Sequence, residues 1–70
     1  MAMDYDVQRL ELGDVVLIEL DDQAGPVEAK VVREIERTAT AVRVSLRIDG
    51  REDVVREWRL GERITVVRGP

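Results

Sequence analysis

Cysteine, histidine and phenylalanine are missing from this chain, and its only aromatic residues are Tyr5 and Trp58. Without cysteine there can be no disulfide framework, and without cysteine or histidine the usual zinc ligands are absent. The absence of cysteine and histidine also removes the commonest catalytic nucleophiles and bases, although a mechanism that uses carboxylates stays open. We therefore expect a protein that is not an enzyme and that needs no cofactor and no metal.

Long apolar runs are also missing, and the N-terminus has no basic-then-apolar signal pattern. We accordingly expect a cytoplasmic location. A chain of 70 residues forms one small domain, and such a domain buries only about 60% of its unfolded surface. Its stability must come from valine, leucine and isoleucine, and a valine-rich core favours strands because branching at Cβ suits a pleated surface.

The net charge of −4 hides an asymmetry between the two halves of the chain. Residues 1–29 hold eight acids and one base, a balance of −7, whereas residues 30–70 hold seven acids and ten bases, a balance of +3; these two balances sum to −4. A bulk polyanion would be repelled by the whole chain, but a basic face on the second half remains open.

Residues 41–48 carry the clearest pattern in the sequence. Valine, leucine or isoleucine occupies each even position, and alanine, arginine or serine occupies each odd position. This period of two is typical of a half-buried antiparallel strand. Asp49-Gly50 follows and favours a hairpin turn. A return strand through Val54, Trp58 and Leu60 faces the core if the loop has three or five residues.

Further strands are expected at residues 15–20, 27–37 and 63–68. The run at 27–37 could also be helical by propensity, but its β-branched content favours a strand. Arg33 falls on the apolar face of this strand, so we expect a bulge or a strand end there. Thr38-Ala39 as a two-residue turn would place Glu34 opposite Arg43, Ile35 opposite Val42 and Val31 opposite Leu46. Residues 1–9 are expected to be a tail, with the domain at 10–70.

The order of these segments resembles the small SH3-like barrels, in particular the Tudor and KOW-type domains. Gly13-Asp14-Val15-Val16 is similar to the opening motif of that group, Ala29-Lys30-Val31 to its second strand, and residues 42–50 to its third strand and turn. The resemblance implies an all-β, antiparallel, five-stranded barrel with a single helical turn before the last strand, here at residues 60–62.

The chain departs from these families at their ligand sites. Tudor-type readers hold a methylated cation in an aromatic cage, but here the corresponding positions hold Gly25, Pro26, Val27, Leu46 and Ile48. KOW-type domains use a basic first loop, whereas this loop carries Asp21 and Asp22. The resemblance therefore implies neither a methyl-lysine reader nor nucleic-acid binding through the first loop.

Three groups of residues are candidate sites. Lys30, Arg43, Arg47 and Arg56 could form an outer face for phosphates or a partner, unless Glu34, Glu36, Glu52 and Glu57 neutralise it. Val55, Thr65 and Val67 lie outside the predicted core and could form an apolar contact patch. Asp21 and Asp22, with Asp14 or Glu19, could hold a hard cation, but a solvated acidic loop is favoured.

We expect a non-enzymatic protein-interaction module that docks a protein partner or serves as a small subunit of an assembly. The alternative is a nucleic-acid-associated factor that binds phosphates through the arginine face. Trp58 is expected to be a core anchor rather than an interface residue, because one large ring fills a core that has few aromatics. Self-association is left open.

Overall fold

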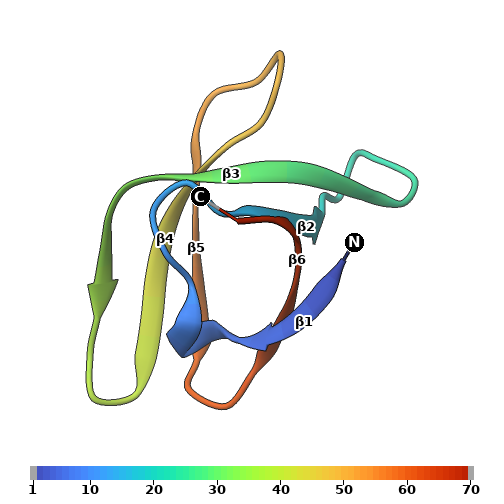
Figure 1. Cartoon of the computed structure of the whole chain (residues 1–70). Helices are drawn as coiled ribbons and strands as arrows, with labels where there is room; N and C mark the ends of the chain where they lie inside the picture. The colour runs from blue at the N-terminus through green and yellow to red at the C-terminus, as the bar shows by residue number, and fades with distance from the viewer. Residues whose placement is uncertain (1, 70) are drawn as a thin grey trace.

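The computed structural model describes residues 2–69, which form six strands and one turn of 3-10 helix (Figure 1). In chain order the elements are β1 (Met3–Asp6), η1 (Val7–Arg9), β2 (Val15–Glu19), β3 (Pro26–Arg37), β4 (Ala41–Arg47), β5 (Val54–Arg59) and β6 (Arg63–Arg68). The strands form one antiparallel sheet in the order β1-β6-β2-β3-β4-β5. The all-β prediction is confirmed.

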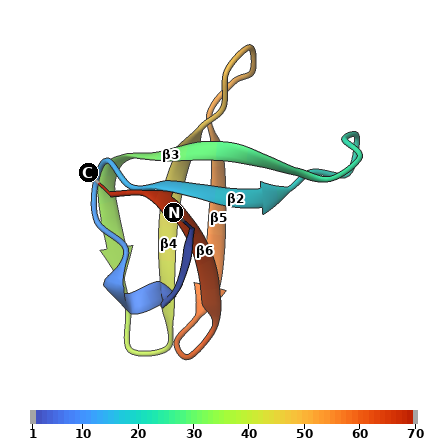
Figure 2. The same cartoon turned by 45° about the vertical axis from the view of Figure 1, so that its right-hand side comes forward.

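The sheet curves around a single aliphatic core, with the β4–β5 hairpin running across β2 and β3 (Figure 2). Valine, leucine and isoleucine supply almost all of the buried side chains, and Tyr5 and Trp58 pack against them from its margin. The core consists of Val7, Leu10, Val16, Ile18, Ala29, Val31, Val42, Val44, Leu46, Ile48, Ile64 and Val66. Trp58 is half-buried, so it anchors the core from its edge.

β4 follows the predicted alternation. Val42, Val44, Leu46 and Ile48 are buried, whereas Arg43 and Arg47 are exposed on the other face. Full burial of one such aliphatic side chain contributes about 1.5–3 kcal/mol. Since the net stability of a small domain is only about 5–15 kcal/mol, the loss of even one of these side chains would remove a large fraction of it.

The prediction of a closed five-stranded barrel is not confirmed. β1 and β5 lie at the two edges of the sheet, which is therefore open. The sixth strand is β1, in the segment expected to be a tail: it pairs with β6 from Met3 opposite Val66 to Asp6 opposite Arg63. Val7 and Leu10 follow it into the core, which explains why this segment is ordered. Met1 and Pro70, at the ends of the predicted tail and domain, lie outside the described residues.

The helical turn expected at residues 60–62 is wrong. A tight turn joins β5 to β6, because the Glu62 N–H donates to the Arg59 carbonyl at 3.1 Å and Gly61 has φ +96°. The positive φ of Gly61 is not a helical conformation, so the three residues between the two strands form a β-turn and not a helical turn. The 3-10 turn of the described residues is instead η1, next to β1.

β3 is a strand, and the predicted bulge at Arg33 is confirmed. The β3–β4 register shifts between Val32 and Glu36, and Arg33 has φ +63° with its side chain 71% exposed. The bulge turns this arginine out of the apolar face. β3 bends where its pairing passes from β2 to β4 (Figure 1).

The predicted β3–β4 register is correct beyond the bulge and wrong next to the turn, because the turn lies one residue later than expected. Val31 lies opposite Leu46 as expected, but Glu36 rather than Glu34 faces Arg43, and Arg37 rather than Ile35 faces Val42. The Thr38 N–H donates to the Ala41 carbonyl at 2.9 Å, so the turn residues are Ala39 and Thr40.

The β4–β5 hairpin has the predicted parity, with Val54 and Trp58 on the core side. Its loop is longer than expected, because seven residues, 47–53, separate the paired residues Leu46 and Val54. Consequently Trp58 faces Val42 rather than Val44.

Candidate functional site

The predicted basic face is divided between the two sides of the sheet. Arg43 and Arg47 lie on the outer face of β4, and Lys30 lies directly opposite Arg47. Arg56 faces Val44 and therefore lies on the core side, where its Nη2 donates to the Glu19 carbonyl at 2.9 Å. Including Arg56 in an outer face was wrong, because the hairpin register places the even residues of β5 inward.

The two arginines that remain on the outer face, Arg43 and Arg47, each pair with a carboxylate. Arg47 donates to both oxygens of Asp53, from Nε at 3.1 Å and from Nη2 at 3.2 Å. The hydrogen bond from Arg47 lowers the pKa of Asp53 against a smaller opposing effect of burial, and the same bond raises the pKa of Arg47. Arg43 lies 3.8 Å from Glu36. The two arginines are thus neutralised, but of the four glutamates expected to do this only Glu36 takes part, and Asp53 supplies the other carboxylate.

The predicted apolar patch is not brought together along the sheet. Val55 is 60% exposed on β5, an edge strand, whereas Thr65 and Val67 are half-buried on β6, which lies next to β1 and β2. The Thr65 hydroxyl donates to Asp4 at 2.7 Å and so is already occupied. Of these three residues, only Val55 exposes a large apolar side chain.

The acidic first loop gathers no metal site in the part of the chain that is described: no three histidine, cysteine or acidic side chains there could hold one ion. Asp22 instead accepts a hydrogen bond from Arg51 at 3.0 Å. Between residues 2 and 69, no helix has the length and apolar character needed to cross a membrane.

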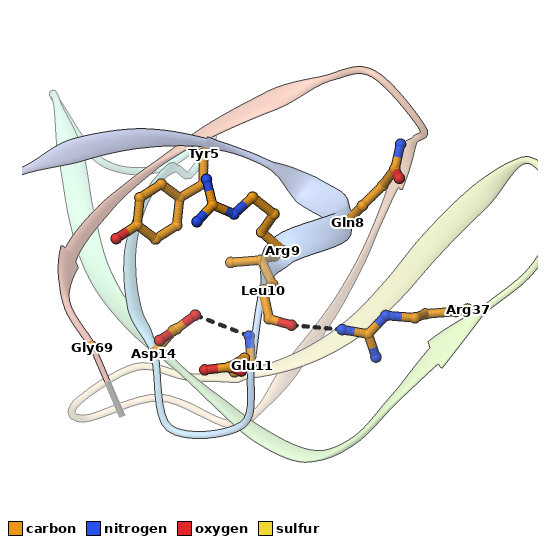
Figure 3. Close-up of a pocket in the computed structure, with 8 residues that line it drawn as sticks. All are labelled: Tyr5, Gln8, Arg9, Leu10, Glu11, Asp14, Arg37 and Gly69. Atoms are coloured by element: carbon orange, nitrogen blue, oxygen red, sulfur yellow. Dashed lines mark hydrogen bonds between the residues drawn. The ribbon is translucent and has the colours of Figure 1, made fainter.

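A different site lies where η1 leads into β2. The structure has a cavity of about 410 Å³ there, which we call the end cavity (Figure 3). It is lined by Tyr5, Gln8, Arg9, Leu10, Glu11, Asp14, Arg37 and Gly69. Segments from the beginning, the middle and the end of the chain meet here, because β1 pairs with β6 and β3 passes beside the Leu10–Asp14 segment.

Asp14 is the one charged side chain among the described residues that is buried, with 3% of its surface exposed. Its Oδ2 accepts a hydrogen bond from the Glu11 N–H at 2.9 Å, and its own N–H donates to the Glu11 carbonyl at 3.1 Å. These bonds close the turn that begins at Glu11. The Asp14 carbonyl also accepts from the Val31 N–H at 2.8 Å, which fixes the turn against β3.

Two arginines line the end cavity in different ways. The Arg9 guanidinium lies over the Tyr5 ring, 5.0 Å from its centroid, within the range of a cation–π contact. Arg37 donates from Nη2 to the Leu10 carbonyl at 2.6 Å (Figure 3). Since Arg37 lies 27 residues from Leu10, this bond ties the end of β3 to the segment before β2.

A more apolar depression of about 460 Å³ adjoins the end cavity, and we call it the Leu12 surface. It shares Glu11 and Arg37 with the end cavity. Two apolar residues line it, Leu12, which is 57% exposed, and the half-buried Ile35. The full lining is Glu11, Leu12, Arg33, Glu34, Ile35 and Arg37.

Sequence reasoning missed this end of the molecule. It placed Gly13-Asp14 in a family motif, but it assigned residues 1–9, with Tyr5 and Arg9, to a tail and gave no role to Leu12. The available signal was the alternation of polar and apolar residues from Asp4 to Val7, which fits a short strand.

Comparison with protein-family models, with curated proteins and with solved structures finds no match to this chain.

Proposed function

We propose that this protein is a non-enzymatic protein-interaction module that binds an extended segment of a partner protein across the end cavity and the Leu12 surface. The supporting observation is Leu12, which is 57% exposed in a depression that shares Glu11 and Arg37 with the more polar end cavity. An apolar side chain surrounded by charged residues favours a protein partner, because apolar contact contributes affinity and the charged rim contributes orientation.

The strand arrangement supports the finer proposal of an SH3-like architecture. From β2 to β5, each strand pairs with the next along the chain. β6 does not pair with β5 but returns to pair with β2. The last of these five strands thereby meets the first, as a sheet that curls into a small barrel requires. β1 would then be an addition to that arrangement, and the end cavity lies beside it.

The backbone at Arg33 supports the same site. A non-glycine residue with positive φ is strained, and such strain is concentrated at functional sites. Here the bulge holds the Arg33 side chain at the rim of the Leu12 surface instead of in the core. A rigid strand bulge positions this side chain more firmly than a mobile loop would.

Peptide selection tests the proposal. A displayed library of linear peptides is selected against the full chain, and the enriched peptides are measured by titration. Leu12→Asp should weaken them by about tenfold or more, since a charge replaces a buried apolar contact. Val55→Asp is the matched control, because Val55 is similarly exposed on a distant strand. A failure to enrich any peptide, or a larger loss from Val55→Asp, would overturn the proposal.

A nucleic-acid function is the second candidate, and one observation favours it. Lys30, Arg47 and Arg68 gather around Val15 in a depression of about 150 Å³. Glu28 and Asp49 line the same depression, so its charge is nearly balanced. A low-salt anisotropy titration with single-stranded RNA and with duplex DNA separates the two functions. Phosphate binding weakens steeply as salt rises, and no binding at low salt eliminates this candidate.

A further inference from the structure

We propose that the end cavity recognises a guanidinium group: an arginine side chain of the partner replaces Arg9 over the Tyr5 ring and pairs with the Asp14 carboxylate. This inference rests on the proposed function and adds the chemistry of the segment that is bound. Three features of the cavity support it: a buried carboxylate with an open oxygen, an internal cation on the ring, and the charge that remains when that cation moves.

The carboxylate of Asp14 is only partly satisfied. One oxygen accepts the Glu11 N–H, and the other has no hydrogen-bond partner among the described residues. No fully buried side-chain oxygen or nitrogen in that part of the chain lacks a partner, so this second oxygen must be accessible. Since Asp14 is 97% covered and lines the end cavity, the access is from the cavity. A carboxylate with so little contact with water gains strongly from a charged donor.

The position of Arg9 shows that a guanidinium group fits over the Tyr5 ring in the end cavity. Its guanidinium is stacked over Tyr5 at 5.0 Å, and within residues 2–69 it forms no ion pair (Figure 3). The contact with the ring is therefore its main attachment, and an exposed cation–π contact is weak. Arg9 is an exposed side chain at the end of a three-residue turn, so it can move into solvent at little cost.

Displacement of Arg9 would leave a cavity that favours a cation. Glu11 and Asp14 point their carboxylates to the same side of the cavity, while Arg37 reaches Leu10 from the opposite side (Figure 3). With Arg9 outside, two carboxylates remain against one arginine that is already bonded to a carbonyl. A planar guanidinium can stack on Tyr5 and donate to Asp14 at once, whereas a lysine ammonium cannot stack in this way.

The test is a titration of the full chain with N-acetyl-argininamide, followed through the backbone amide of Glu11 by nuclear magnetic resonance. Binding to the unaltered chain should be weak, because Arg9 competes at a high effective concentration. Arg9→Ala removes this internal competitor and should bind the probe about tenfold more tightly. N-acetyl-citrullinamide has the same shape without the charge, so it should bind about tenfold more weakly than the arginine probe.

Two variants complete the test. Asp14→Asn keeps an oxygen for the Glu11 N–H but loses the charge, and it should weaken the arginine probe by about tenfold. Gln23→Ala changes an exposed glutamine of the first loop, outside the end cavity, and should leave binding unchanged. Equal binding of the two probes, or no gain from Arg9→Ala, would overturn the inference. The selected peptides give an independent outcome: peptides that depend on Leu12 but contain no arginine would overturn the inference and leave the proposed function standing.

Discussion

The end cavity and the base of the β4–β5 hairpin are each organised around one aspartate, and the two carboxylates are used in opposite ways. Asp53 is 24% exposed, yet Arg47 donates to both of its oxygens, and Arg33 lies 3.6 Å from one of them. Asp14 is 3% exposed, yet only one of its oxygens has a partner among the described residues. The more accessible group is therefore the less available for a ligand.

This contrast shows why exposed charge is a poor guide to function in this molecule. Surface ion pairs contribute little and form easily, since more than a third of the residues are charged. A buried carboxylate that is only partly hydrogen-bonded carries a free-energy cost, so its presence needs a reason. One reason is structural, because Asp14 closes a turn. The other is the proposed function, in which the open oxygen pairs with an arginine of the partner.

The largest expected effect comes from removing the buried aspartate. Asp14→Ala leaves the Glu11 N–H without its acceptor, and an unsatisfied group of this kind costs about 1–3 kcal/mol of unfolding free energy. Asp53→Ala should cost less, because its ion pairs are on the surface. Urea denaturation of the two variants at neutral pH measures the difference.

Asp14→Asn is the control for that experiment, because its side-chain oxygen can still accept the Glu11 N–H. It should stay closer to the unaltered chain than Asp14→Ala does. Should Asp53→Ala prove the more destabilising of the two alanine variants, the comparison drawn between these carboxylates would be reversed.

The hairpin region was largely predictable from the sequence, because its information is local. The alternation at 42–48 gave β4, and an arginine on an apolar face gave the bulge at Arg33. The position of the β3–β4 turn was not readable: it lies at Ala39-Thr40, one residue later than expected, and this changed the partner of Arg43 from Glu34 to Glu36. Likewise the β4–β5 loop has seven residues, where three or five were expected, and this changed the partner of Trp58 from Val44 to Val42.

The end cavity was not predictable in the same way, because its residues are distant along the chain. Tyr5 and Asp14 meet only because β1 pairs with β6 at the edge of the sheet. The bond from Arg37 to Leu10 depends on where β3 bends. No local period encodes these contacts, and the short β1 by itself is too weak a pattern to distinguish from a tail.

An intermediate effect is expected at the residue that connects the two regions. Arg33 lies beside Asp53 and also lines the Leu12 surface. A positive φ costs a non-glycine residue about 1–2 kcal/mol, whereas glycine adopts it freely but loses roughly 0.5–1 kcal/mol through its flexible unfolded state. Arg33→Gly should therefore raise the unfolding free energy by about 0–1.5 kcal/mol.

Glu34→Gly is its matched control in the same bulge. Glu34 does not have positive φ, so the glycine there brings only the entropic loss of about 0.5–1 kcal/mol. Thermal or urea denaturation that ranks Arg33→Gly below Glu34→Gly would show that the arginine side chain contributes more than its backbone strain costs.

The smallest effect is the pH dependence of the hairpin base. The hydrogen bond from Arg47, with a lesser contribution from the charge of Arg33, holds the pKa of Asp53 below its ordinary value in the folded chain. A lowered folded pKa means that this contribution to stability is present above the unfolded pKa of about 4 and is lost as the pH falls through the folded pKa. Asp53→Asn should therefore lower stability slightly at pH 7 and not at about pH 2, measured by urea denaturation at both values. A penalty that persists unchanged in acid would assign the role of Asp53 to its shape rather than to its charge, and the contrast with Asp14 would then rest on burial alone.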